Sequence, residues 1–172
     1  KELGMKTFFN MLGPLVNPAK PAMQLTGVYS LELMRLYKYL LEKTSKKFLV
    51  VYGLDGYDEI SLTSGFKIST QKEEIIYTPE ELGFSTQTQQ DIYGGDTVAE
   101  AAKIFTQILA GNGTAEQNNA VIANSAMAVY LAKNTSMSDA VQIARESLES
   151  GKANGVFKKL LKVCSQWQML LV

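Results

Sequence analysis

Histidine is absent from this sequence of 172 residues, and cysteine and arginine are scarce. Without histidine, the chain lacks the side chain that most often transfers protons near neutral pH and most often binds transition metals. Cys164 is the only cysteine, so neither a disulfide nor a thiolate zinc site forms within one chain. The usual activation of a cysteine nucleophile by histidine is therefore excluded.

Net charge is also lacking, because 17 basic residues balance 17 acidic ones. A neutral chain offers no electrostatic case for nucleic acid or for an anionic membrane. Arg35 and Arg145 are the only arginines, so bidentate phosphate clamps are scarce. No continuous apolar run is long enough to span a membrane, and the start lacks the pattern of a signal peptide. We expect a cytoplasmic protein with no membrane and no nucleic-acid partner.

The patterns that are present predict one α/β domain over residues 1–172, with a partly parallel sheet flanked by helices. Segments 24–29 and 47–54 read as strands, and a helix capped by Ser30 lies between them, which predicts a right-handed βαβ unit with parallel strands. Short, less buried and antiparallel strands are expected at 60–62, 66–69 and 74–77. From residue 96 onward the spacing of apolar residues is helical, with interruptions expected at Gly151 and Gly155.

Two glycines and three carboxylates follow the second strand, within Gly53 to Glu59. In open α/β sheets ligands collect where strands end, and the adjacent carboxylates of Asp58 and Glu59 suit Mg²⁺ beside a substrate phosphate. The other interpretation is structural. Asp55-Gly56 between apolar segments is a strong signal for a tight hairpin, which would place Asp58 and Glu59 on the solvent face of a second strand.

Residues 1–18 carry a more specific pattern, ELG-x-(R/K)-T-x-FN-x-LGPL-x-NP. Together with the G-x-DG-x-DE-x-S pattern of residues 53–61, it resembles the anthranilate phosphoribosyltransferases, enzymes of tryptophan biosynthesis. Shorter matches follow in order over about nine tenths of the chain, at 24–28, 78–83, 94–96, 124–126 and 150–153. The resemblance implies part of a catalytic domain like those of nucleoside phosphorylases and phosphoribosyltransferases.

The resemblance also implies a reaction and a set of site residues. The family transfers the phosphoribosyl group of phosphoribosyl pyrophosphate to the amine of anthranilate and releases pyrophosphate. By resemblance, Asp58 and Glu59 are the Mg²⁺ ligands. Gly13 and Pro14 line the anthranilate channel, and Asn10 completes the substrate-binding set mainly by shaping the same loop. Neighbours on a regular strand point to opposite faces, so the two carboxylates reach one ion only if the chain there is a loop; otherwise they serve two ions.

Several family features would precede Lys1: the GTGGD diphosphate loop, a Lys-His-Gly-Asn-Arg-like segment, an arginine that contacts anthranilate and the helical domain through which the full protein forms a homodimer. We therefore expect this chain to be the C-terminal part of a larger phosphoribosyltransferase and to be inactive alone. Three rival hypotheses remain: a pyrimidine-nucleoside phosphorylase-like enzyme, a non-catalytic relative that binds nucleic acid, and a purely structural fragment.

Overall fold

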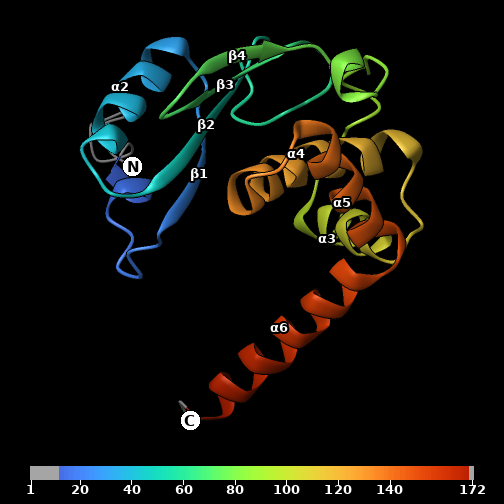
Figure 1. Ribbon diagram of the computed structural model, residues 1–172. Coiled ribbons are helices and arrows are strands. Elements are labelled where there is room, and N and C mark those ends of the chain that lie inside the picture. The colour runs from blue at the N-terminus through green and yellow to red at the C-terminus, as the bar shows by residue number, and fades with distance from the viewer. Residues whose placement is uncertain (1–11, 171–172) are drawn as a thin grey trace, which may run out of the picture.

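The computed structural model describes residues 12–170, with side chains through residue 165. These residues form a four-stranded sheet, in the order β1-β2-β3-β4, with helices on both faces (Figure 1). The strands are β1 (Met23–Gly27), β2 (Lys47–Gly53), β3 (Phe66–Thr70) and β4 (Glu74–Tyr77). The helices are α2 (Leu31–Glu42), α3 (Val98–Leu109), α4 (Ala115–Lys133), α5 (Met137–Glu149) and α6 (Lys152–Leu170), with 3₁₀ turns η1 (Gly13–Leu15) and η2 (Glu80–Leu82).

The predicted βαβ unit is confirmed, because β1 and β2 are parallel and α2 connects them. The Ser30 hydroxyl caps α2 by accepting a hydrogen bond from the backbone N–H of Leu33 at 3.2 Å. This cap satisfies one of the amides that the first turn of a helix leaves unpaired. The carboxyl ends of β1 and β2 therefore lie at the same edge of the sheet.

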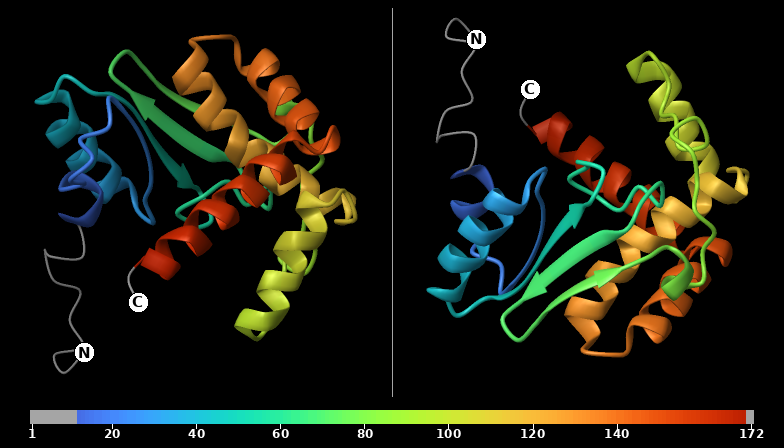
Figure 2. Two further views of the ribbon diagram at one scale, coloured as in Figure 1. Left: turned by 90° about the horizontal axis from the view of Figure 1, so that it is seen from below. Right: turned by 90° about the horizontal axis from the view of Figure 1, so that it is seen from above.

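The central strand β2 is buried on both faces and divides the core in two. Phe48 and Val50 pack with α2, whereas Leu49 and Val51 pack with β3, α4 and α5. The alternation follows from the period of two along a strand. Figure 2 shows the sheet between α2 on one side and α4 with α5 on the other. Burial of these side chains fixes the register of β2, because a slip by one residue would exchange the two faces.

The second half of the sheet is antiparallel as predicted, with β2 paired to β3 and β3 to β4. Two details of the prediction are wrong. β3 is largely buried, and segment 60–62 is not a strand. Leu62 has a φ of 61°, a left-handed conformation that a regular strand cannot contain. The segment belongs to the irregular connection of residues 54–65.

The helical part of the chain begins after a loop that follows η2. Thr97 and Thr114 each form a capping box, with Glu100 and Gln117 respectively, and so start α3 and α4. The expected interruption at Gly155 is wrong, because α6 begins at Lys152 and continues through that glycine. The long α6 extends away from the other helices (Figure 1). Among residues 12–170, none of the helices combines the length and the apolar content that spanning a bilayer requires.

Candidate active site

Asp58 and Glu59 lie in the irregular connection that joins β2 to β3, and both side chains are exposed. The tight hairpin considered from the sequence is wrong, because Gly53 at the end of β2 pairs with Phe66 at the start of β3. Residues 54–65 therefore form a wide loop and not a two-residue turn. A loop is the arrangement in which two neighbouring carboxylates can converge on one ion.

A close backbone contact fixes this loop at the end of the parallel strands. A Cβ atom on Gly27, the last residue of β1, would lie only 1.6 Å from the carbonyl oxygen of Asp58. Only glycine leaves room for the Asp58 backbone to approach so closely. The pair of carboxylates is thus held at the carboxyl ends of β1 and β2, where ligands of open α/β sheets collect.

The third carboxylate of the motif, Asp55, has an internal role. It accepts hydrogen bonds from the hydroxyl of Ser61 at 3.1 Å and from the hydroxyl of Thr63. The start of the loop is closed by backbone bonds, among them Gly53 N–H to Tyr57 C=O at 2.9 Å. Asp55 therefore braces the loop from within, which leaves the exposed Asp58 and Glu59 as its candidate metal ligands.

The described residues contain no group of three or more carboxylate, cysteine or histidine side chains arranged to hold a metal ion. Asp58 and Glu59 are therefore at most a pair of candidate carboxylate ligands at this loop. Mg²⁺ is usually bound by one or two carboxylates, several waters and substrate phosphates. The exposed pair of carboxylates fits that pattern, because it leaves the other coordination positions of the ion to water and to substrate phosphates.

The Gly-Pro segment predicted to contact substrate lies in η1, with both Gly13 and Pro14 exposed. The Pro14 carbonyl accepts a hydrogen bond from the Gln24 side chain at 2.8 Å, which ties η1 to β1. Gln24 and Gly27 are three residues apart on β1, roughly 10 Å along an extended strand. The structure therefore brings η1 and the carboxylate loop to the same strand, at positions three residues apart. Asn10 lies outside the described residues.

Sequence reasoning did not assign a role to Asn124, which lies on α4. Its amide oxygen accepts from the Ile60 N–H at 2.9 Å, and its amide nitrogen donates to the Ile60 carbonyl at 2.8 Å. The signal in the sequence was a polar side chain inside the most apolar stretch of that helix, where Ile122, Ala123, Ala126 and Met127 are buried. An amide in such a stretch requires a polar partner.

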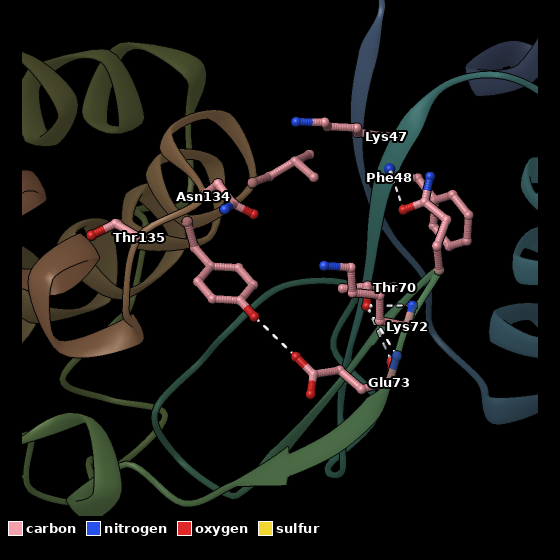
Figure 3. Close-up of a pocket in the computed structure, with 10 residues that line it drawn as sticks. Lys47, Phe48, Thr70, Lys72, Glu73, Asn134 and Thr135 are labelled. Atoms are coloured by element: carbon pink, nitrogen blue, oxygen red, sulfur yellow. Dashed lines mark hydrogen bonds between the residues drawn. The ribbon is translucent and has the colours of Figure 1, made fainter.

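A separate cavity of about 460 Å³ lies at the other end of the sheet, between the start of β2, the β3–β4 turn and the end of α4. In Figure 3 the amines of Lys47 and Lys72 point into the space between the sheet and the helices. The Tyr130 hydroxyl reaches across it and donates to Glu73 at 3.0 Å. Burial, followed by this hydrogen bond, raises the pKa of Tyr130. The cavity is lined by none of the site residues predicted from the sequence.

Comparison with known proteins supplies the family. A model of the glycosyl transferase family, a/b domain, matches residues 1–154. An anthranilate phosphoribosyltransferase of Bacteroides fragilis (strain YCH46) is 48% identical over 164 residues, which are 95% of this chain and 50% of that protein. The one from Flavobacterium psychrophilum is 49% identical over 160 residues, 93% of this chain and 48% of that protein. The resemblance drawn from the sequence motifs is therefore confirmed.

Solved structures agree with this fold. The anthranilate phosphoribosyltransferase of Thermus thermophilus has a TM-score of 0.81 at 33% identity, covering 92% of this chain and 48% of that one. The Saccharomyces cerevisiae protein, in complex with PRPP and Mg, has a TM-score of 0.86 at 22% identity, covering 96% of this chain and 48% of that one. The predicted α/β architecture is confirmed. The chain spans about half the length of these relatives.

Proposed function

This chain belongs to the glycosyl transferase family, and we propose that it is the C-terminal α/β portion of an anthranilate phosphoribosyltransferase. The observation that carries the proposal is the Asp58-Glu59 pair, exposed on a braced loop at the carboxyl ends of β1 and β2. The close identity to anthranilate phosphoribosyltransferases over nearly the whole chain supports the choice of substrates. Homodimer formation and a cytoplasmic location belong to the same proposal.

The reaction is a displacement at the anomeric carbon of phosphoribosyl pyrophosphate. The anthranilate nitrogen supplies the electron pair of the new C–N bond, pyrophosphate leaves with the electrons of the broken C–O bond, and the nitrogen then loses a proton. An aromatic amine already has an available lone pair, so no strong general base is obligatory. A chain without histidine is therefore compatible with this chemistry.

In this proposal Asp58 and Glu59 would hold Mg²⁺. The positive charge of the ion would offset the negative charge of the diphosphate. The two carboxylates meet the requirement for hard oxygen ligands, and their exposure leaves room for the substrate phosphates. The Saccharomyces cerevisiae protein of the same fold, solved with PRPP and Mg, supports a magnesium-dependent reaction. Asp55 acts indirectly, through the Ser61 and Thr63 hydroxyls that it holds.

Gly13 and Pro14 form the proposed wall of the anthranilate channel, together with Asn10. Glycine permits close backbone approach to a ligand, and proline fixes the shape of the turn. A Cβ atom on Gly13 would meet nothing within 4 Å, so the space beside this backbone is open. The hydrogen bond from Gln24 to the Pro14 carbonyl holds the turn against β1.

Activity of the 172-residue chain and of the complete product of its gene, assayed with anthranilate, phosphoribosyl pyrophosphate and Mg²⁺, tests the proposal. We expect turnover by the complete protein and none by this chain alone, because half of the phosphate site would be missing.

In the complete protein, Asp58→Asn and Glu59→Gln should each lower kcat/KM at least about tenfold. Glu42→Gln is the matched control, because Glu42 is exposed at the end of α2, away from the loop. Equal activity in all three variants would refute the assigned metal role.

A further inference from the structure

We propose that Asn124 is the positioning residue for the Asp58-Glu59 pair, which it holds in place through the backbone of Ile60. This inference rests on the proposed function, because it assigns to α4 a part in the same metal site. Asn124 is 64 residues from Ile60 in the sequence and touches it with both ends of its amide. Its role is distinct from that of a catalytic residue, since it acts only through the loop.

The amide of Asn124 makes three hydrogen bonds in this arrangement, and both of its N–H donors have a partner. Its oxygen accepts from the Ile60 N–H at 2.9 Å, and its nitrogen donates to the carbonyls of Ile60 at 2.8 Å and of Ala120 at 2.9 Å. The bond to Ala120, one turn earlier on α4, orients the side chain. An amide carries its donor and its acceptor on two separate atoms of one short side chain, so it can pair with the N–H and the C=O of the same residue. The loop is thereby paired to a helix as a strand would be paired to its neighbour.

The position of this pairing matters for Glu59. The Ile60 N–H belongs to the planar peptide that joins Glu59 to Ile60, so fixing that N–H fixes the plane that begins at the Glu59 Cα. On the other side of the pair, the Asp58 carbonyl is packed against Gly27. The two carboxylate residues thus lie between two backbone restraints, one from β1 and one from α4.

The residues that follow show why a restraint is needed. Leu62 is fully buried and has a φ of 61°, which is unfavourable for a bulky side chain. Its carbonyl accepts from the Gln87 N–H at 2.8 Å, and Ile60 is buried in the core. Such strain persists only where surrounding contacts determine the backbone, and it is often found at functional sites. Asn124 supplies one of those contacts directly beside the carboxylates.

Mn²⁺ is a suitable probe, since it prefers the same oxygen ligands as Mg²⁺ and its free fraction is measured by electron paramagnetic resonance. With phosphoribosyl pyrophosphate present, we expect Asn124→Ala and the similarly sized Asn124→Leu to weaken Mn²⁺ binding to the complete protein about tenfold. Asn118→Ala is the matched control. Asn118 is also a partly buried amide on α4, but it bonds at 3.5 Å to the Gly113 carbonyl, away from the loop. It should leave Mn²⁺ affinity unchanged.

Two further variants separate this inference from the proposed function. If Asp58→Asn and Glu59→Gln leave Mn²⁺ affinity unchanged, the metal site itself is wrong and the role of Asn124 falls with it. If those variants abolish binding while folded Asn124→Ala and Asn124→Leu bind as the unaltered protein does, only the positioning role is overturned. Equal weakening by Asn118→Ala would also overturn it, because the effect would then be a general loss of stability in α4.

A measurement on the unaltered protein keeps the inference testable if the Asn124 variants do not fold. The Ile60 amide hydrogen, which is bonded to Asn124, should exchange with solvent roughly a hundredfold more slowly than that of Asp58 after correction for intrinsic rates. Exchange at equal rates would show that the pairing does not hold the loop, and would overturn the proposal.

Discussion

The two ends of β2 carry charged side chains in contrasting ways. At its carboxyl end, the loop of residues 54–65 is restrained by Gly27, Asn124 and the Asp55 carboxylate, and it presents Asp58 and Glu59 outward. At its amino end, Lys47 and Lys72 stand at the border of a cavity and have no ion-pair partner among the described side chains.

This difference teaches that restraint of the charged groups, more than the presence of charge, distinguishes the candidate metal site. A binding site needs side chains whose own supports are fixed. The carboxylates extend from a braced loop, whereas the amines of Lys47, the first residue of β2, and of Lys72, in the β3–β4 turn, end long and flexible stems. Substitutions at both ends of β2 test whether the loop is as strongly restrained as its contacts indicate.

The largest effect is expected for Gly27→Ala, because the new Cβ would overlap the Asp58 carbonyl oxygen. Relief of this overlap must displace the loop or β1, so we expect a loss of about 3 kcal/mol in the free energy of unfolding. Urea denaturation measures it. Gly94→Ala is the control, because a Cβ there would meet nothing within 4 Å. Equal stability of the two variants would show that the contact is not restraining.

A smaller loss, about 1.5 kcal/mol in the free energy of unfolding, is expected for Asp55→Ala, which removes a charged acceptor from two hydroxyls. The Ser61 hydroxyl belongs to a buried residue and would lose its bond to a carboxylate. Asp91→Ala is the comparison, because Asp91 accepts from the backbone and side chain of Thr88 in an exposed loop. If Asp91→Ala is the more destabilising of the two in urea, Asp55 does not brace its loop.

Near the amino end of β2, Glu74 pairs with Lys38 at 2.8 Å and with Lys67 at 2.5 Å. These hydrogen bonds lower the pKa of Glu74 from 4.5 to about 2. Because the pKa is lowered by folding, the stabilisation is present above pH 4.5 and is lost as the pH falls toward 2. We expect Glu74→Gln to cost about 1 kcal/mol at neutral pH, since partial exposure to solvent weakens the pairs.

Unfolding of the unaltered protein and of Glu74→Gln, followed at a series of pH values, measures this contribution. The difference between them should shrink steadily as the pH falls from 4.5 toward 2. A difference that stays constant over this range would contradict an ionic origin.

The smallest effect is expected for Tyr130→Phe in the cavity of Figure 3, which removes only the hydrogen bond to exposed Glu73. We expect about 0.5 kcal/mol, the lower end for one intramolecular hydrogen bond. Thermal unfolding would detect this loss of stability. Tyr77→Phe is the control, because burial also raises the pKa of Tyr77, but Glu73 acts on Tyr77 through its charge at a distance and not through a hydrogen bond. If Tyr130→Phe lowered the free energy of unfolding as much as Asp55→Ala does, the two ends of β2 would not differ in how strongly they are restrained.

Local patterns predicted the parts of the fold that local physics determines. The cap at Ser30 and the buried strand expected at 47–54, which the structure has at Lys47–Gly53, each depend on residues close together in the sequence. The neighbouring carboxylates Asp58 and Glu59 were likewise visible directly after a strand. Such features need no knowledge of the distant chain.

The parts that were missed depend on distant contacts. Segment 60–62 has the composition of a strand, but Asn124 pairs with Ile60 in place of a neighbouring strand, and Leu62 is left-handed. The need for glycine at position 27 arises from the Asp58 backbone, which is far along the sequence. Gly155 was overestimated as a helix breaker, since a helix tolerates a single glycine at a cost of roughly 1 kcal/mol.

The most direct test of the central claim, that Asp58 and Glu59 bind a divalent cation, is a titration of the ¹⁵N-labelled protein with Mn²⁺ and phosphoribosyl pyrophosphate, followed by NMR. The bound ion broadens the signals of nearby nuclei. The account predicts that the amide signals of Gly27, Asp58 and Glu59 broaden first, that those of Lys47 and Lys72 stay sharp, and that Asp58→Asn with Glu59→Gln abolishes the effect. Broadening centred on any other part of the chain, or unchanged by these substitutions, would contradict it.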